Sequence, residues 1–137
     1  MSLKRTRLYR CGAFGVVFVI LFSLTLPGQW IELFQSFVHP WWPWPSSGLV
    51  SHDFPIDKLV HTFLFLLAAA LFVRGWSELR KHWYLIALSL LLFGLLTEFI
   101  QRFVPGRNAS LGDLVADIVG IALGVWFAMV YLRKRYK

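Results

Sequence analysis

The chain has 137 residues, of which 58% are hydrophobic and only 15% are charged, and its formal net charge is +7. In soluble proteins about a quarter of the residues are charged, and a soluble chain of this size could not bury so much apolar surface in one core. The composition therefore excludes an ordinary soluble domain and predicts an integral membrane protein. The single cysteine, Cys11, excludes an internal disulfide, and we assign it no role.

Four apolar segments are long enough to cross a membrane as helices. At 1.5 Å per residue, roughly 20 helical residues span the hydrocarbon core, and about 17 is the lower limit. The predicted helices cover residues 8–26, 58–74, 83–104 and 111–132. We therefore expect an all-α membrane protein, a four-transmembrane-helix bundle that forms a single domain over residues 1–137.

The first predicted helix follows a basic N-terminus, a pattern that a cleaved signal peptide shares. The sequence SLTLPGQW at its end has no small-x-small cleavage site, so we expect an uncleaved helix. Residues 27–57 then form a Trp- and Pro-rich loop that contains HPWWPWP. Proline prevents a regular helix and tryptophan favours the headgroup region, so we expect an interfacial outer loop, in which QWIELFQSF is a candidate amphipathic helix. A lid over a lipid or sugar site is the alternative for these aromatic residues.

The basic residues are distributed unevenly between the two ends of the predicted bundle. Of the 14 Lys and Arg residues, all except Lys58, Arg102 and Arg107 fall on the side of the two termini. Because short cytoplasmic loops are enriched in Lys and Arg, we expect both termini to be cytoplasmic. Topology and anionic headgroups explain the net charge, so we expect the lipid bilayer as a partner and no nucleic acid.

Ionisable residues occur within three of the predicted helices. His61 follows Asp57, and Asp117 follows Asp113, each by one helical turn, while Glu98 lies about 9 Å inside the outer end of its helix. His61, Glu98 and Asp117 are therefore expected at similar depth. Since a charged side chain at the centre of a spanning helix costs about 2.5–3.5 kcal/mol on insertion scales, these groups should face one another or a water-filled pocket.

The hairpin PGRNASLGD joins the last two predicted helices near the outer surface. Ser110 precedes Asp113 by three residues, as in a capping pair, so a helix cap is an alternative to a functional role for Asp113. Arg107 is a topological arginine, a counter-ion for the acids, or a ligand for phosphate, which its planar guanidinium suits. Gln101 lies on the same helix stripe as Glu98.

Small residues recur every four positions along the last predicted helix. Such spacing lets helix backbones approach closely, and we expect the tightest contact at Gly120 and Gly124. The neighbour is either another helix of the same chain or a second copy, so a homo-oligomer through the Gly120/Gly124 face is one expectation. The stripe consists of Gly112, Ala116, Gly120, Gly124 and Ala128.

DKLVH followed by TEFIQRFVPGRNASLGDLVADIVG resembles the VanZ-like family of small integral membrane proteins, named for a teicoplanin-resistance determinant. The ordered elements are Asp-Lys-x-x-His, Glu-x-x-Gln, Pro-x-Arg and the acids that open the last helix, and the resemblance covers residues 57–126. It implies a cell-envelope role and, in some members, reduced susceptibility to glycopeptide or lipopeptide antibiotics, without a defined reaction. It marks Asp57, Lys58, His61, Glu98, Gln101, Pro105, Arg107, Asp113 and Asp117.

These observations favour a site in the outer leaflet that binds, and in one version modifies, a phosphate-bearing envelope lipid in a bacterial cytoplasmic membrane. His61 and Glu98 would act as acid or base and Asp117 would orient them, which makes these three the candidate catalytic residues. Whether the protein is an enzyme is left open. The candidate substrate-binding residues are Asp57, Lys58, Gln101, Arg107 and Asp113.

Three other functions remain open at this point. A structural or accessory subunit would use buried charge pairs to fix helix register, and a small proton-coupled transporter would use them as a relay. The third is a divalent metal site, for which His61, Glu98, Asp113 and Asp117 offer nitrogen and oxygen ligands. Their spacing matches no recognised zinc pattern, so we expect no metal and no other cofactor.

Overall fold

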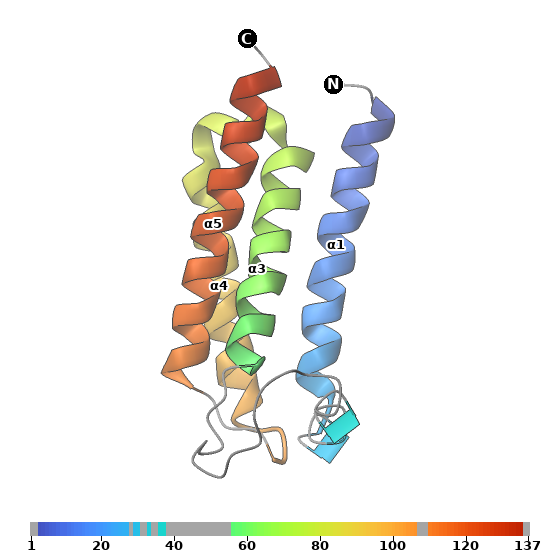
Figure 1. The fold of residues 1–137 in the computed structure, drawn as a ribbon, viewed down its shortest axis with the longest axis vertical. Coiled ribbons are helices and arrows are strands. Elements are labelled where there is room, and N and C mark those ends of the chain that lie inside the picture. Colours follow the sequence, from blue (N-terminus) through green and yellow to red (C-terminus); the bar gives the residue numbers. More distant parts are fainter. Residues whose placement is uncertain are drawn as a thin grey trace.

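The computed structural model describes residues 3–27, 29–30, 33, 36–37, 56–106 and 110–135. Within these ranges the chain is helical and has no strand, and four helices are long and apolar enough to cross a membrane (Figure 1). The prediction of an all-α protein with four spanning helices is confirmed. The elements are α1 (Leu3–Thr25), α3 (Ile56–Gly75), the 3-10 helix η2 (Ser77–His82), α4 (Trp83–Gln101) and α5 (Leu111–Arg135).

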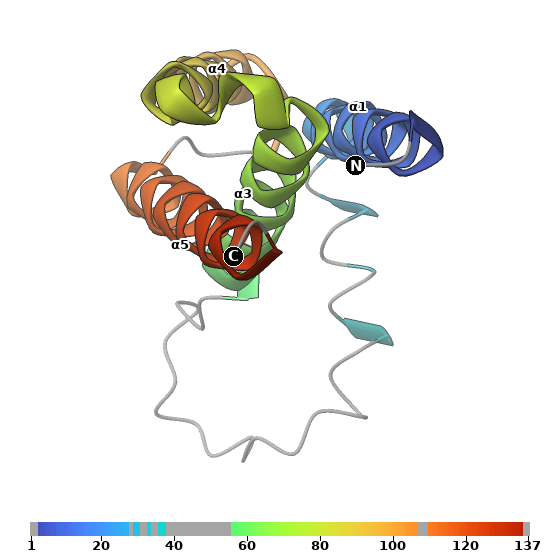
Figure 2. The ribbon, with the colours of Figure 1, turned by 90° about the horizontal axis from the view of Figure 1, so that it is seen from above.

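Helix α3 lies at the centre of the bundle and contacts α1, α4 and α5. Seen from above in Figure 2, the other three helices surround it. The beginning of α1 and the end of α5 lie at the same end of the bundle, as an even number of crossings requires (Figure 1). The connection through η2 lies at this end as well, so the hairpin between α4 and α5 lies at the opposite end.

The start of α1 and the ends of α4 and α5 differ from the predicted ones by three residues or more. Helix α1 begins at Leu3 rather than at residue 8, so its first turns carry the basic N-terminal residues. Helix α4 ends at Gln101 rather than Val104, because the N–H groups of Phe103 and Val104 donate to carbonyls three residues earlier and tighten the last turn. Gly106 then adopts a φ of 74°, a left-handed conformation that suits glycine and helps to reverse the chain.

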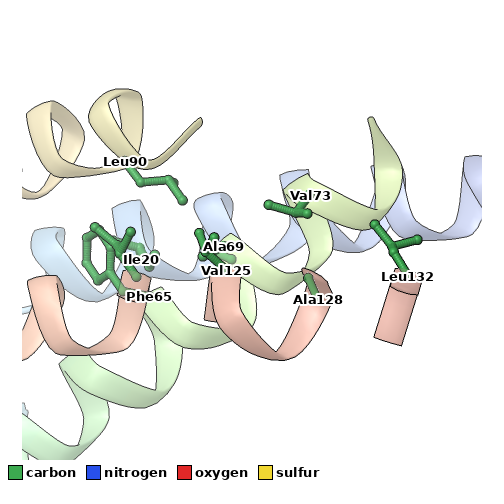
Figure 3. Packing of buried hydrophobic residues seen from close by; sticks show 10 residues of the cluster. Ile20, Phe65, Ala69, Val73, Leu90, Val125, Ala128 and Leu132 are labelled. Atoms are coloured by element: carbon green, nitrogen blue, oxygen red, sulfur yellow. The ribbon is translucent and has the colours of Figure 1, made fainter. Parts of the chain in front are cut away.

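The core is a narrow column of apolar side chains along α3, with contributions from the three other helices (Figure 3). The outward faces carry large apolar side chains, for example Phe18, Leu92 and Trp126, which are 68%, 57% and 57% exposed. An apolar outer surface of this extent is unfavourable in water and suits contact with lipid chains. The core residues are Ile20, Phe65, Ala68, Ala69, Val73, Leu90, Ile121, Val125, Ala128 and Leu132.

Two glycines of α5 lie directly against the backbone of α3. A Cβ atom placed on Gly120 would lie 2.3 Å from the carbonyl oxygen of Thr62, and one placed on Gly124 would lie 2.3 Å from that of Leu66. Only a hydrogen at these positions fits, so the two helices pack backbone to backbone. The neighbour at this face is thus a helix of the same chain, and a homo-oligomer stays a prediction.

Arg10 connects α1 to the end of α3. Its Nε–H donates to the carbonyl oxygen of Gly75 at 2.9 Å, and its guanidinium forms an ion pair with Glu78 and lies 5.0 Å from the ring of Trp76. These contacts position α1, which otherwise meets the bundle mainly through α3.

Most of the predicted outer loop, including the HPWWPWP segment, lies outside the described residues. The described residues between Gln29 and Phe37 are helical, in agreement with the candidate helix in this segment, and the Trp30 side chain is 58% exposed. The location of this loop at the membrane interface stays a prediction.

Replacing Gly120 by alanine should destabilise the protein, because the added methyl group would overlap the Thr62 carbonyl and force α3 and α5 apart. Overpacking of a close contact costs about 1–3 kcal/mol, and we expect at least this loss in the free energy of unfolding in detergent. Gly15→Ala on α1 is the matched control, since nothing lies within 4 Å of its added methyl. Equal stability of Gly120→Ala and Gly15→Ala would contradict the packing described.

Candidate functional site

His61 of α3 and Asp117 of α5 form the centre of the candidate site. Nδ1 of His61 lies 2.9 Å from Oδ1 of Asp117, whose side chain is fully buried. A second bond links the same helices beside this pair, as the Thr62 hydroxyl donates to the carbonyl oxygen of Ala116 at 3.2 Å. The contact depends on the close approach of α3 and α5 at Gly120.

Glu98 reaches the same position from α4. Its side chain is buried, with 8% exposure, and one ligand atom each from His61, Glu98 and Asp117 lies within 4.8 Å of the others. Three separate helices therefore bring together the three residues that the depth argument groups. Their catalytic role stays a prediction.

The carboxylate of Glu98 also holds the start of α5. The backbone N–H of Ser110 donates to Oε2 of Glu98 at 3.0 Å, while the Ser110 hydroxyl oxygen accepts the N–H of Gly112 at 3.1 Å. The expected cap by Ser110 is present. The reciprocal bond, which in a capping pair would come from Asp113, comes from Glu98 on the neighbouring helix, so capping does not account for the Asp113 carboxylate.

Asp113 faces Lys58 instead. Its Oδ1 lies 3.7 Å from Nζ of Lys58. The Asp113 side chain is buried, with 8% exposure, whereas the Lys58 side chain is 40% exposed. A Cβ atom on Gly112 would lie 2.7 Å from Cε of Lys58, so the glycine leaves room for the lysine chain to cross the start of α5. Lys58 is three residues before His61, which places it about one turn nearer to the start of α3.

Of the other predicted binding residues, the structure describes Gln101 in full, Asp57 in part and Arg107 not at all. Gln101 is buried at the end of α4, with 3% exposure, one turn beyond Glu98. Asp57 lies in the first turn of α3, but its side chain is outside the described part of the chain. Arg107 also lies outside the described residues.

Two residues that shape the site were missed at the level of sequence. A Cβ atom on Gly94 would lie 2.8 Å from Oδ2 of Asp117 and 3.4 Å from Cζ of Phe65, so this glycine gives the Asp117 carboxylate its space against α4. Phe65 is 1% exposed and belongs to the apolar core, which begins one helical turn after His61 along α3. The signal was available: Gly94 is one turn from Glu98, and Phe65 is one turn from His61.

The site has more acceptors than donors. Among the described residues, Oε1 of Glu98 and Oδ2 of Asp117 are buried and have no hydrogen-bond partner. An imidazole that donates its Nδ1–H to Asp117 has a basic Nε2, which can accept a proton or bind a metal ion. The arrangement is therefore suited to proton transfer or to binding a cation.

The chain is similar in sequence to known proteins. Over 81 residues the chain is 32% identical to a fission yeast (Schizosaccharomyces pombe) protein described only as uncharacterized, a match that covers 58% of this chain and 50% of the yeast protein. The chain thus spans about half the length of that curated relative. No solved structure matches the chain. Residues 4–132 match the VanZ/LLP1 family, and because this match covers nearly the whole chain, the protein belongs to the VanZ/LLP1 family and is a multi-pass membrane protein.

Proposed function

We propose that this protein binds a phosphate-bearing envelope lipid at the end of the bundle where α3 and α5 begin. The observation that carries the proposal is the partly exposed side chain of Lys58 near the buried polar group of His61, Glu98 and Asp117. Arg107, on the same hairpin as Ser110, would add a second positive charge suited to phosphate.

The surroundings of this polar group suit a lipid better than a soluble anion. Phe99, Phe103 and Leu111 lie at the same end of the bundle and are 56%, 74% and 83% exposed. A lipid would place its headgroup near Lys58 and its acyl chains along these apolar side chains. Both contacts would contribute to affinity.

The polar group also contains what acid–base chemistry on a bound headgroup requires. His61 would transfer protons through Nε2, Glu98 would be its acid or base partner, and Asp117 would orient the imidazole. Ser110 accepts the Gly112 N–H as the cap of α5, so the proposal assigns it no nucleophilic role. The resemblance to VanZ-like proteins extends the proposal to glycopeptide or lipopeptide susceptibility, because these antibiotics act at the envelope.

Retained lipid measured by native mass spectrometry tests this function. Lys58→Ala and Arg107→Ala should each lower the fraction of protein that carries an anionic phospholipid by about tenfold, because a lost charge-assisted contact to phosphate is worth about 1.5–3 kcal/mol. Lys81→Ala removes the same charge at the other end of the bundle and should retain lipid like the wild type. Unchanged retention in both Lys58→Ala and Arg107→Ala would contradict the proposal.

We further propose that the protein resides in a bacterial cytoplasmic membrane with both termini in the cytoplasm. The excess of Lys and Arg at the end of the bundle that holds the termini supports this orientation. It would place Lys58 and His61 in the outer leaflet, where an envelope lipid is accessible.

Reporter fusions in bacterial cells test the orientation. Green fluorescent protein fused after Lys137 should fluoresce, and alkaline phosphatase inserted after residue 50 should be active, because each reporter functions on only one side of the membrane. The reciprocal fusions should both be silent. Active phosphatase at the C-terminus would contradict the proposed orientation.

A structural role is the second candidate, and a specific observation favours it. The bonds from His61 to Asp117 and from Ser110 to Glu98 each join different helices, or a helix and the hairpin that follows it. Polar contacts of this kind can fix the register of neighbouring helices. The protein would then act through its shape, as an accessory subunit.

A double-mutant cycle measures how much the His61–Asp117 contact contributes to folding. We expect His61→Ala and Asp117→Ala to be non-additive by about 1–3 kcal/mol in the free energy of unfolding in detergent, since the two side chains are in direct contact. His61→Ala combined with Glu78→Ala at the other end of the bundle should be additive within about 0.5 kcal/mol. Additivity of the first pair would remove the basis for a register-fixing role.

A further inference from the structure

Three side chains of the kinds that bind metal ions in proteins lie close together between α3, α4 and α5. One ligand atom each from His61, Glu98 and Asp117 lies within 4.8 Å of the others. Two ligands that bind the same ion at about 2.0–2.2 Å are separated by at most about 4.4 Å. The limit of 4.8 Å is slightly larger, so the ligand atoms would have to move closer together to bind one ion.

The buried carboxylate oxygens are an independent indication that a ligand is bound. Within the described part of the chain, Oδ2 of Asp117 and Oε1 of Glu98 have no hydrogen-bond partner, and the two side chains are 0% and 8% exposed. Gly94 leaves the space into which Oδ2 points, on the face of α4 that also carries Glu98. Buried polar atoms are normally satisfied, so both oxygens indicate a missing donor or cation.

The charges also favour a cation. Glu98 and Asp117 place two carboxylates side by side above an apolar layer that begins at Phe65. The ammonium group of Lys58 lies against a different acid, Asp113. A divalent ion would neutralise both carboxylates at once and would leave His61 uncharged, as metal binding requires.

We propose that His61, Glu98 and Asp117 bind one divalent transition-metal ion, of the class represented by Zn²⁺ and Mn²⁺. One imidazole nitrogen with two carboxylates suits these ions better than Ca²⁺ or Mg²⁺, which prefer oxygen ligands alone. The spacing of these residues along the sequence matches no zinc pattern because the ligands come from three helices. Three protein ligands leave at least one coordination position open, as in catalytic metal sites. The proposal does not depend on lipid binding, and with the ion bound it replaces the acid–base roles of His61 and Glu98.

Metal uptake by the full-length protein in detergent tests the site. The wild type, stripped with a chelator and then incubated with ZnCl₂ or MnCl₂, should retain about one ion per chain after desalting, as measured by inductively coupled plasma mass spectrometry. His61→Ala, Glu98→Gln and Asp117→Asn should each weaken binding at least about tenfold, since even the loss of a residue that only supports a metal ligand costs about 10–100-fold. Circular dichroism and gel filtration would establish that each variant is folded.

Two matched controls use the same residue types at the other end of the bundle. His82 and Glu78 are exposed and lie in η2, and His82→Ala and Glu78→Gln should take up metal like the wild type. Two results would overturn the proposal: no stoichiometric uptake of either ion by the wild type, or uptake by folded His61→Ala and Asp117→Asn equal to that of the wild type.

A measurement on the wild type keeps the proposal testable if the variants do not fold. Mn²⁺ is paramagnetic and broadens the nuclear magnetic resonance signals of nearby protons. At substoichiometric Mn²⁺, the ring signals of His61 should broaden well before those of His82, whose signals the His82→Ala spectrum identifies. Equal broadening of both rings would show adventitious binding and would overturn the proposal.

Discussion

Backbone contact between α3 and α5 at Gly120 and Gly124 sets the relative position of His61 and Asp117, the centre of the candidate site. Because only hydrogens separate α5 from the Thr62 and Leu66 carbonyls, the helices are close enough for His61 to reach Asp117. Small residues permit such packing between membrane helices, where the hydrophobic effect supplies little attraction between helices. The position of the acids on α5 therefore depends on the adjoining stripe of small residues, which brings α5 against α3.

The cost of burying carboxylates explains why the site lies near the ends of the helices and not at their middle. Glu98 lies in the last turn of α4, from which its Oε2 reaches the N–H of Ser110, the residue just before α5. Asp113, in the first turn of α5, is near Lys58, whose side chain is 40% exposed. Each acid thus has a donor or cation within reach, and one buried oxygen each of Glu98 and Asp117 has no hydrogen-bond partner.

Hydrophobic segment length was sufficient to predict the four helices, because lipid imposes the same length on each. Helical periodicity combined with depth also grouped His61, Glu98 and Asp117 correctly. Segment length and periodicity could not show that Glu98, rather than Asp113, accepts the Ser110 N–H. That bond depends on where α4 ends and on how the chain returns to α5. Gly94 was missed although its spacing to Glu98 is visible in the sequence, because the sequence does not show that the Asp117 carboxylate of α5 lies against it.

A cluster of carboxylates binds phosphate poorly unless a positive charge lies between the carboxylates and the phosphate. Glu98 and Asp117 would repel an anionic headgroup, and Lys58 already faces Asp113, so its ammonium group is shared between an acid and any bound phosphate. The lipid proposal therefore needs further positive charge, from Arg107 or from an ion held by His61, Glu98 and Asp117. An ion with an open coordination position would change the sign of the site's interaction with phosphate while leaving the same side chains in place. On this argument, the acids that make phosphate binding unfavourable in the bare protein would become the ligands that make it favourable.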